Sequence, residues 1–214
     1  EAALNYADEI SDRARLASAC NVIYLKNERL FADCTDGFGL IRDVEENLKI
    51  SLKNKKILIL GAGGAARGII PSIIEKNPAK LKIANRTESK ALSLKADLED
   101  KVDLKKKNLI FEAGSLLDDF LLTDSYDLVI NSTSVSTQIG ESLGLPKALF
   151  SGTKLAYDLF YADEKTVFMQ DALAGGAEKV SDGWGMLVEQ GAESFKLWTN
   201  LIPDTSRLLE KPID

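Results

Sequence analysis

The sequence predicts an α/β protein built on a doubly wound parallel sheet, and three observations support this fold class. Residues 56–60 (KILIL) form a short apolar run without alternation, which is typical of a strand buried on both faces. This run leads directly into the glycine-rich turn 61–66 (GAGGAA) and then into helix-forming residues. Further apolar runs alternate with helical patterns as far as residue 183. Together these features predict a Rossmann-type nucleotide-binding domain.

The remaining elements are expected in the following order. Residues 1–18 predict a helix, because alanine, leucine and isoleucine are interspersed with charges, and residues 20–32 predict a β-hairpin. The loop that follows is expected to open a helix near residue 40. Beyond the strand at 56–60, the expected strands are 81–86, 109–111, 126–131, 155–161 and a minimal 179–180, and the expected helices are 65–76, 88–98, 166–174 and an amphipathic 184–200.

The composition excludes several classes of function. The 214 residues include no histidine, which removes histidine general bases, Ser-His-Asp triads and most zinc sites, so no metal site is expected. The net charge of −6, without a long basic run, argues against nucleic acid as a partner. No apolar run approaches the roughly 20 residues of a membrane helix. Two isolated cysteines and a polar, acidic beginning favour the cytoplasm over export.

The glycine-rich turn predicts a dinucleotide site. In the pattern G-x-G-x-x-A, Gly61 makes the tight bend, Gly63 allows a pyrophosphate to approach, and Ala66 packs the helix against the strand. The N-terminus of the following helix favours an anion at this turn. The alternative is a plain structural turn with no ligand.

The residues after the next expected strand favour NADP over NAD. A site for NAD typically has Asp or Glu about 20 residues after the turn, where the carboxylate binds a ribose hydroxyl. This chain has Asn85, Arg86 and Thr87 there, and an amide, a guanidinium and a hydroxyl suit a 2′-phosphate. The alternative is that Arg86 is a surface charge and Thr87 caps the next helix.

Several separated motifs resemble the shikimate dehydrogenase family. They are ACN at 19–21, TDGFG at 35–39, GAGGAAR at 61–67, NRT at 85–87, NSTS at 131–134, YDLFY at 157–161 and GWGMLVEQGAESFKLW at 183–198. The motifs occur in the family's order and cover essentially the whole chain. The resemblance implies a cytoplasmic, NADP-dependent oxidoreductase of aromatic amino acid biosynthesis. Such an enzyme reversibly reduces 3-dehydroshikimate to shikimate.

The resemblance also implies roles for individual residues. Asp36 is expected to assist proton transfer together with a lysine, although Asp36 taken alone favours an interpretation as a helix N-cap. Substrate contacts are implied for Asn21, Asp36, Tyr161 and Gln190. Cofactor contacts are implied for Gly61, Ala62, Gly63, Gly64 and Ala65, for Asn85, Arg86 and Thr87 at the 2′-phosphate, and for Thr133, Ser134, Leu159 and Gly183.

The family pattern further implies a domain organisation. Residues 1–45 are expected to be the remnant of an α/β substrate domain, 46–183 the NADP-binding domain, and 184–214 helices that pack back toward the substrate domain. The catalytic lysine of the family is expected upstream of Glu1, so the polypeptide as written is expected to bind NADP(H) but hardly to turn over.

Departures from the family pattern leave alternatives open. Cys34 and Ser136 stand where the family usually has asparagine and glycine, which puts the substrate preference in question. The alternatives are a relative that acts on quinate or uses NAD, and a catalytically inactive NADP-binding regulatory module. Either a monomer or a homodimer is expected.

Overall fold

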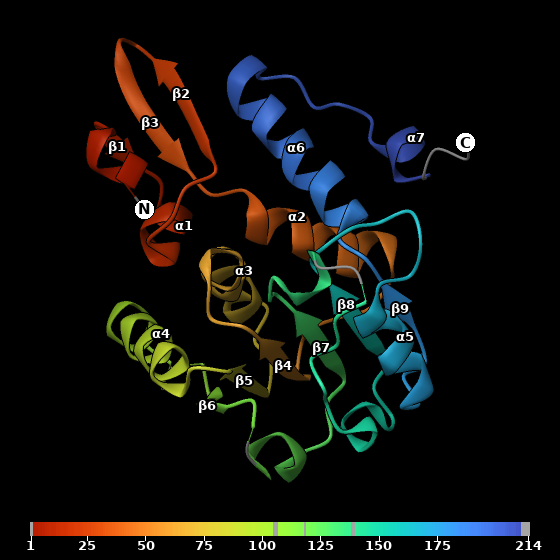
Figure 1. The fold of residues 1–214 in the computed structure, drawn as a ribbon. Helices are drawn as coiled ribbons and strands as arrows, with labels where there is room; N and C mark the ends of the chain where they lie inside the picture. Colours follow the sequence, from red (N-terminus) through yellow and green to blue (C-terminus); the bar gives the residue numbers. More distant parts are fainter. Residues whose placement is uncertain (1, 105–106, 118, 138–139, 211–214) are drawn as a thin grey trace. The chain divides into compact units, whose positions relative to one another are not determined.

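The computed structural model describes residues 2–104, 107–117, 119–137 and 140–210. The chain divides into two compact units, whose elements are labelled in Figure 1. Residues 52–66 and 76–183 form the sheet unit, and residues 1–51, 67–75 and 184–214 form the α2–α6 unit. Within the described residues, no helix is long and apolar enough to cross a lipid bilayer.

The sheet unit is built on parallel strands. In the described residues these are β4 (Lys56–Leu60), β5 (Lys80–Asn85), β6 (Ile110–Ser115), β7 (Leu128–Asn131), β8 (Leu155–Asp158) and β9 (Val180–Ser181). Their order is β6-β5-β4-β7-β8-β9, and every pairing is parallel. The chain moves outward from β4 to β6 and then returns to the other side of β4 at β7. This reversal confirms the predicted doubly wound sheet.

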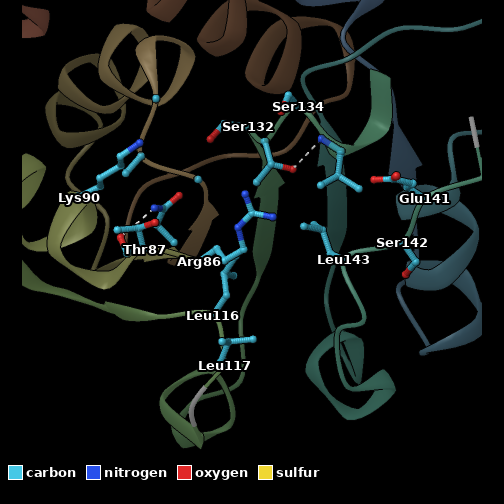
Figure 2. A pocket seen from close by; sticks show the side chains of 16 residues that line it. Arg86, Thr87, Lys90, Leu116, Leu117, Ser132, Ser134, Glu141, Ser142 and Leu143 are labelled. Atoms are coloured by element: carbon cyan, nitrogen blue, oxygen red, sulfur yellow. Dashed lines mark hydrogen bonds between the residues drawn. The ribbon is translucent and has the colours of Figure 1, made fainter. Parts of the chain in front are cut away.

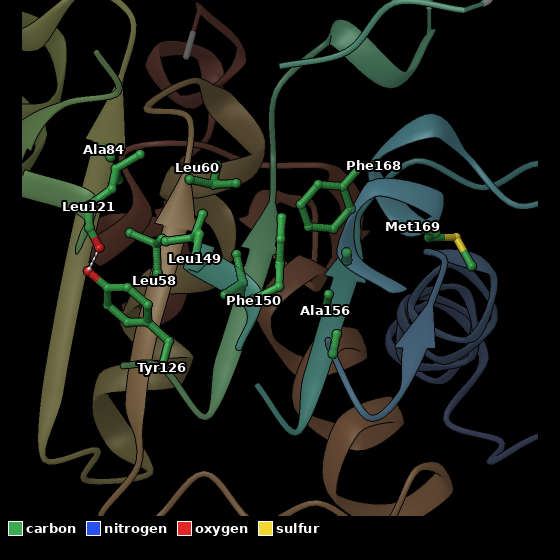
Figure 3. Close-up of a cluster of buried hydrophobic side chains, with 13 residues drawn as sticks. Leu58, Leu60, Ala84, Leu121, Tyr126, Leu149, Phe150, Ala156, Phe168 and Met169 are labelled. Atoms are coloured by element: carbon green, nitrogen blue, oxygen red, sulfur yellow. Dashed lines mark hydrogen bonds between the residues drawn. The ribbon is translucent and has the colours of Figure 1, made fainter. Parts of the chain in front are cut away.

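Helices and apolar side chains bury the strands of this unit. The helix α4 (Glu88–Lys101) packs against β5 and β6, and α5 (Val167–Ala174) packs against β8 and β9. Short 3₁₀ helices connect the strands at Asp119–Thr123, Val135–Thr137 and Lys147–Phe150. Figure 3 shows the apolar cluster on one side of the sheet, which includes Leu58, Leu60, Ala84, Tyr126, Val129, Phe150, Ala156 and Phe168. Full burial of these positions explains why the strands appear in the sequence as continuous apolar runs.

The α2–α6 unit combines a small sheet with helices. The strands β1 (Glu9–Ile10), β2 (Val22–Lys26) and β3 (Arg29–Asp33) lie in the order β1-β3-β2, with β2 and β3 antiparallel as the predicted hairpin. The helical elements are η1 (Ala2–Tyr6), α1 (Asp12–Ala17), α2 (Asp36–Arg42), the π-helical η2 (Asp43–Asn47), α6 (Trp184–Thr199) and α7 (Ser206–Leu209). The helix α3 (Gly64–Glu75) starts in the sheet unit, and its residues 67–75 belong to the α2–α6 unit.

The helices α2 and α6 pack closely because a glycine stands at their contact. A Cβ atom on Gly39 would lie 2.6 Å from the Met186 carbonyl oxygen, which is far inside van der Waals contact. Any other residue at position 39 would therefore push the two helices apart. On α6, Met186 and Ala192 are buried, whereas Phe195 and Trp198 remain exposed.

The predicted helix over residues 1–18 is wrong. The segment instead divides into η1, β1 and α1. Pairing of Glu9 with Phe31 in a parallel ladder holds the middle of the segment extended. Ser11 then starts a new helix, because its side chain accepts a hydrogen bond from the backbone N–H of Ala14. Tertiary pairing has here overridden the helical propensity of the alanines.

Several predicted strand boundaries also differ from the structure, including the start of β7, which is Leu128 and not residue 126, and two strand ends differ most. The strand expected at 109–111 extends to Ser115, since Glu112 is paired with lysines of β5 and does not end the strand. The strand expected at 155–161 ends at Asp158. Leu159 and Tyr161 therefore lie in the segment that follows β8, and not in the sheet.

Candidate functional site

A pocket of about 580 Å³ opens at the carboxyl ends of β4, β5, β6 and β7 (Figure 2). It lies where the strand order reverses, which is where doubly wound sheets bind ligands. All of its lining residues belong to the sheet unit. They are Gly61, Ala62, Gly63, Asn85, Arg86, Thr87, Lys90, Leu116, Leu117, Ser132, Thr133, Ser134, Val135, Glu141, Ser142 and Leu143.

The glycine-rich turn forms one wall of this pocket. Gly61 has a φ of +109°, a conformation that favours glycine, and its N–H donates to the Ala84 carbonyl at 2.7 Å. A Cβ on Gly61 would lie 2.6 Å from the Ser132 hydroxyl oxygen. A Cβ on Gly63 would meet no atom of the described residues within 4 Å, so the turn leaves space for a ligand beside its backbone. Gly64 and Ala65 begin α3, and neither lines the pocket.

Two cationic side chains line the pocket after β5. Arg86 and Lys90 are both exposed, and Figure 2 shows the Arg86 side chain reaching into the pocket. Asn85 donates its amide to the Thr87 carbonyl at 2.9 Å, which fixes the turn between β5 and α4. Thr87 occupies the N-cap position of α4, but its side chain makes no capping hydrogen bond. Thr87 is thus the N-cap of α4 by position but not through its side chain, and it lines the pocket.

Half of the lining residues were not among the sequence predictions. These are Lys90, Leu116, Leu117, Ser132, Val135, Glu141, Ser142 and Leu143. Lys90 follows Thr87 by three residues, so helical spacing alone places both on one face of α4. The position of Ser132, whose hydroxyl donates to the Leu60 carbonyl at 2.7 Å, depends on the pairing of β7 with β4. No local sequence signal reports that pairing.

The loop after β7 forms the opposite wall. Both the backbone N–H and the hydroxyl of Thr133 donate to the side-chain oxygen of Asn131, at 3.1 and 2.7 Å. The hydroxyl of Thr137 donates to the Ser134 carbonyl at 2.6 Å. These bonds hold the predicted residues Thr133 and Ser134 at the edge of the pocket.

Leu159 and Gly183 contact each other outside the pocket lining. A Cβ on Gly183 would clash with the Leu159 carbonyl oxygen, and the Gly183 N–H donates to the Phe160 carbonyl at 3.1 Å. Tyr161 is 45% exposed, and its ring stacks on Phe160 with 6.1 Å between centroids. The structure thus brings Leu159, which follows β8, against Gly183, which follows β9, within the sheet unit.

A second polar cluster lies in the α2–α6 unit. The Asn21 amide donates to an Asp36 carboxylate oxygen at 2.6 Å. The Asn21 carbonyl oxygen accepts from the backbone N–H of Thr35 at 2.9 Å, which fixes the orientation of the amide. The buried Thr35 hydroxyl lies 3.1 Å from the hydroxyl of Ser194 on α6. Thr35 and Ser194 were not predicted, because a lone hydroxyl residue carries no positional signal in the sequence.

Asp36 is not the N-cap of α2. Thr35 occupies that position, Asp36 is the first residue of the helix, and no side chain caps it. The N-cap interpretation of Asp36 is therefore wrong. Burial raises the pKa of the Asp36 carboxyl, and the hydrogen bond from Asn21 opposes this effect. A carboxyl group with a raised pKa is suited to proton transfer near neutral pH.

Cys34 lies beside this carboxylate but remains protonated. Its sulfur is 4.0 Å from an Asp36 oxygen. Burial, followed by the nearby Asp36 charge, raises the pKa of the thiol to about 12. Because the thiolate is the reactive form, Cys34 is not a nucleophile at neutral pH.

Gln190 presents a buried acceptor on α6. Its side-chain carbonyl oxygen has no hydrogen-bond partner within the described part of the chain. Leaving such an atom unsatisfied costs about 1–3 kcal/mol, so a donor on a ligand is favoured there. Among the described residues, no group of three or more His, Cys, Asp or Glu side chains is placed to hold a metal ion.

Comparisons with known proteins identify the relatives of this chain. Residues 43–152 match the family described as shikimate / quinate 5-dehydrogenase, and residues 183–210 match the shikimate 5'-dehydrogenase C-terminal domain. The chain is 43% identical over 209 residues to a shikimate dehydrogenase (NADP(+)) of Dechloromonas aromatica, covering 98% of this chain and 73% of that protein.

Two solved structures are also similar. Shikimate 5-dehydrogenase from Thermus thermophilus, in complex with NADP(H) and shikimate, is 32% identical with a TM-score of 0.81, covering 98% of this chain and 73% of the other. The ligand-free 5-ketofructose reductase of Gluconobacter is 29% identical with a TM-score of 0.81, covering 97% of this chain and 72% of the other. From these matches, the chain belongs to the shikimate dehydrogenase family.

Proposed function

We propose that this protein is an NADP-dependent oxidoreductase that interconverts 3-dehydroshikimate and shikimate. The observation that carries the proposal is the pocket at the sheet reversal, where the glycine-rich turn faces Arg86 and Lys90. This arrangement occurs in a chain whose relative of 43% identity is named a shikimate dehydrogenase (NADP(+)). NADPH supplies the hydride for a ketone carbon when it is bound.

The pocket residues fit the parts of NADP. The space beside Gly63 accommodates a pyrophosphate close to the backbone, and the N-terminus of α3 favours its charge. Arg86 supplies a planar guanidinium for the 2′-phosphate, with Thr87 as a neutral donor and Lys90 as a second cation. Thr133 and Ser134, on the pocket wall after β7, are proposed to contact the same ligand. Leu159 and Gly183 are proposed to lie near the nicotinamide.

The cluster around Asp36 is proposed to handle the substrate. Asp36 would hold or transfer the proton at the reacting oxygen, since its side chain is half-buried and the pKa of its carboxyl is raised. The amide of Asn21 and the unsatisfied oxygen of Gln190 suit the hydroxyl groups of a polyhydroxylated ring. Tyr161 is proposed as a further substrate contact.

A single activity assay distinguishes 3-dehydroshikimate from other candidate substrates. Because the matching family includes quinate dehydrogenases and a similar structure is a 5-ketofructose reductase, quinate and 5-ketofructose are the informative competitors. We expect NADPH-dependent reduction of 3-dehydroshikimate to have the highest kcat/KM when the full-length gene product is assayed with all three substrates. A higher kcat/KM for 5-ketofructose or quinate would replace the proposed substrate. If none of the three substrates is turned over, the result would support the alternative of a catalytically inactive NADP-binding regulatory module.

We further propose a cytoplasmic protein that is a monomer or a homodimer. Both statements are tested on the natural protein, by cell fractionation and by light scattering.

Replacing Arg86 with glutamine is expected to weaken NADPH binding by about 10- to 100-fold, because charged hydrogen bonds to the phosphate are lost. The affinity for NADH should stay within about twofold, since NADH has no 2′-phosphate. Calorimetric titration with both cofactors measures the two effects. Arg42→Gln serves as the control, since Arg42 pairs with Glu46 and Glu189 in the α2–α6 unit. An equal loss of affinity for both cofactors in Arg86→Gln would contradict the assigned role.

A further inference from the structure

The carboxylate of Asp158 is completely buried at the end of β8. Among the described residues it accepts hydrogen bonds from four neutral donors. They are the Asn131 amide at 3.0 Å, the Ser136 hydroxyl at 2.6 Å, the Thr166 hydroxyl at 2.7 Å and the Phe160 N–H at 3.2 Å. The Asn131 amide also donates to the Ser136 hydroxyl oxygen at 2.9 Å, so the side chains of Asn131, Ser136 and Asp158 are all bonded to one another.

The four donors come from four different segments of the sheet unit. Asn131 ends β7, and Ser136 lies in the short helix η4. Thr166 is the N-cap of α5, and its hydroxyl oxygen also accepts from the Met169 N–H. Phe160 lies between Leu159 and Tyr161. Asp158 therefore connects the segment after β8 to the loop after β7 and to α5.

The same network reaches the pocket wall through Asn131. While the Asn131 amide donates to Asp158, its side-chain oxygen accepts two hydrogen bonds from Thr133, which lines the pocket. Ser136 is outside the pocket lining, but it is bonded to both Asn131 and Asp158. Loss of its hydroxyl would remove this link between η4 and β8 and leave one Asp158 oxygen with a single side-chain donor.

We propose that Ser136 is a positioning residue for the dinucleotide pocket, acting through Asp158 and Asn131. It holds the wall formed by Thr133, Ser134 and Val135 in a fixed place relative to β8. The identity of the dinucleotide rests on the proposed function, whereas the positioning itself does not.

The energetics of the network support a role beyond stability. Burial raises the pKa of the Asp158 carboxyl, and hydrogen bonds from Ser136, Thr166, Phe160 and Asn131 only partly offset this cost. A buried carboxylate without a cation among these partners is a poor way to stabilise a fold. A fully hydrogen-bonded network does fix the relative positions of the segments that share it. The carboxylate suits this purpose because both of its oxygens accept.

The test compares Ser136→Ala with Ser136→Thr. We expect Ser136→Ala to raise the dissociation constant for NADPH by about tenfold, and Ser136→Thr, which keeps the hydroxyl, to restore it to within about threefold. Ser11→Ala is the matched control, since Ser11 donates to Asp33 over the same 2.6 Å in the other unit. The Ser11→Ala control should lower the melting temperature without changing the dissociation constant for NADPH. An unchanged constant in Ser136→Ala, or equal loss in both Ser136 variants, would overturn the proposal.

Amide hydrogen exchange provides a readout that needs no ligand. The N–H groups of Thr133 and Phe160 donate to Asn131 and Asp158 respectively, so both should exchange faster in Ser136→Ala and return toward the wild-type rate in Ser136→Thr. Unchanged exchange at both amides would refute the positioning role even if the cofactor is not the one proposed. Absence of NADPH binding by the wild-type chain would instead count against the proposed function alone.

Discussion

Replacing Asp124 with asparagine is expected to destabilise the protein by about 3 kcal/mol, because the change leaves a buried lysine without its main counter-charge. Lys82 lies in β5 and is completely buried. Its ammonium nitrogen is 2.8 Å from an Asp124 oxygen and 3.3 Å from a Glu112 oxygen. The remaining Glu112 contact keeps the expected loss at the lower end of the range for a broken buried pair.

Chemical denaturation of the variant and of a matched control measures this effect. Glu99→Gln removes an ion pair of similar length, 2.7 Å to Lys95, on the exposed side of α4, and should cost less than about 1 kcal/mol. Adding Lys82→Met to Asp124→Asn should recover part of the lost free energy of unfolding, since the double variant no longer buries an unpaired ammonium. Equal destabilisation by Asp124→Asn and Glu99→Gln would show that burial of Lys82 is energetically unimportant.

The ion pairs of Asp124 also predict how the stability of the protein depends on pH. Burial opposes ionisation of Asp124, but hydrogen bonds from Lys80 and Lys82 outweigh it and lower the pKa of its carboxyl to about 2. A folded-state pKa below the unfolded value of about 3.9 contributes stability that is fully present above that pH. The contribution is lost as the pH falls through 2. The stability difference between wild type and Asp124→Asn should therefore shrink as the pH is lowered from 4 to 2.

Replacing Asp36 with asparagine is expected to lower kcat for 3-dehydroshikimate reduction by about 10²- to 10⁴-fold, the usual contribution of a general acid–base group. Asparagine keeps the shape of the side chain and an oxygen that can accept from Asn21, so the local structure should persist. The affinity for NADPH should change by less than about twofold. The rate is followed as NADPH oxidation by the full-length gene product, with the dissociation constant measured separately.

A charge-removal control separates the role of Asp36 from general electrostatics. Asp12 is exposed in the first turn of α1, and Asp12→Asn removes the same charge from the same unit. Its kcat should stay close to that of the wild type. Near-normal kcat in Asp36→Asn would remove Asp36 from the proposed proton transfer.

The sheet could be predicted because its strands are buried on both faces. An uninterrupted run such as KILIL at β4 indicates a strand without knowledge of its neighbours. Ends of strands were less predictable where tertiary pairs decide them. Glu112 ends the apolar run of β6, yet the strand continues because Lys80 and Lys82 pair with that carboxylate.

The pocket was predictable only where a local motif specifies it. Gly61 and Gly63 follow from the spacing of the turn, and Arg86 follows from its distance along the chain. Leu116 and Ser132 line the same pocket only because β6 and β7 flank β5 and β4 in the sheet. Strand order is a property of the whole fold, so no nearby residue reports it.

The cluster at Asp36 shows a similar limit. Family resemblance identified Asn21 and Asp36 as candidates, and the hairpin places them within hydrogen-bonding distance. The supporting hydroxyls of Thr35 and Ser194 were missed, since their contact joins residues 159 positions apart. Such supporting groups become visible only when the packing of α6 in this unit is known.

The most direct test of the central claim is a comparison of NADPH and NADH binding to this chain by calorimetry. The account predicts that NADPH binds at least about tenfold more tightly than NADH, because Arg86, Thr87 and Lys90 line the pocket where the 2′-phosphate is expected. The preference should weaken as salt is raised, since these side chains are exposed. Equal affinity for the two cofactors, or tighter binding of NADH, would contradict it.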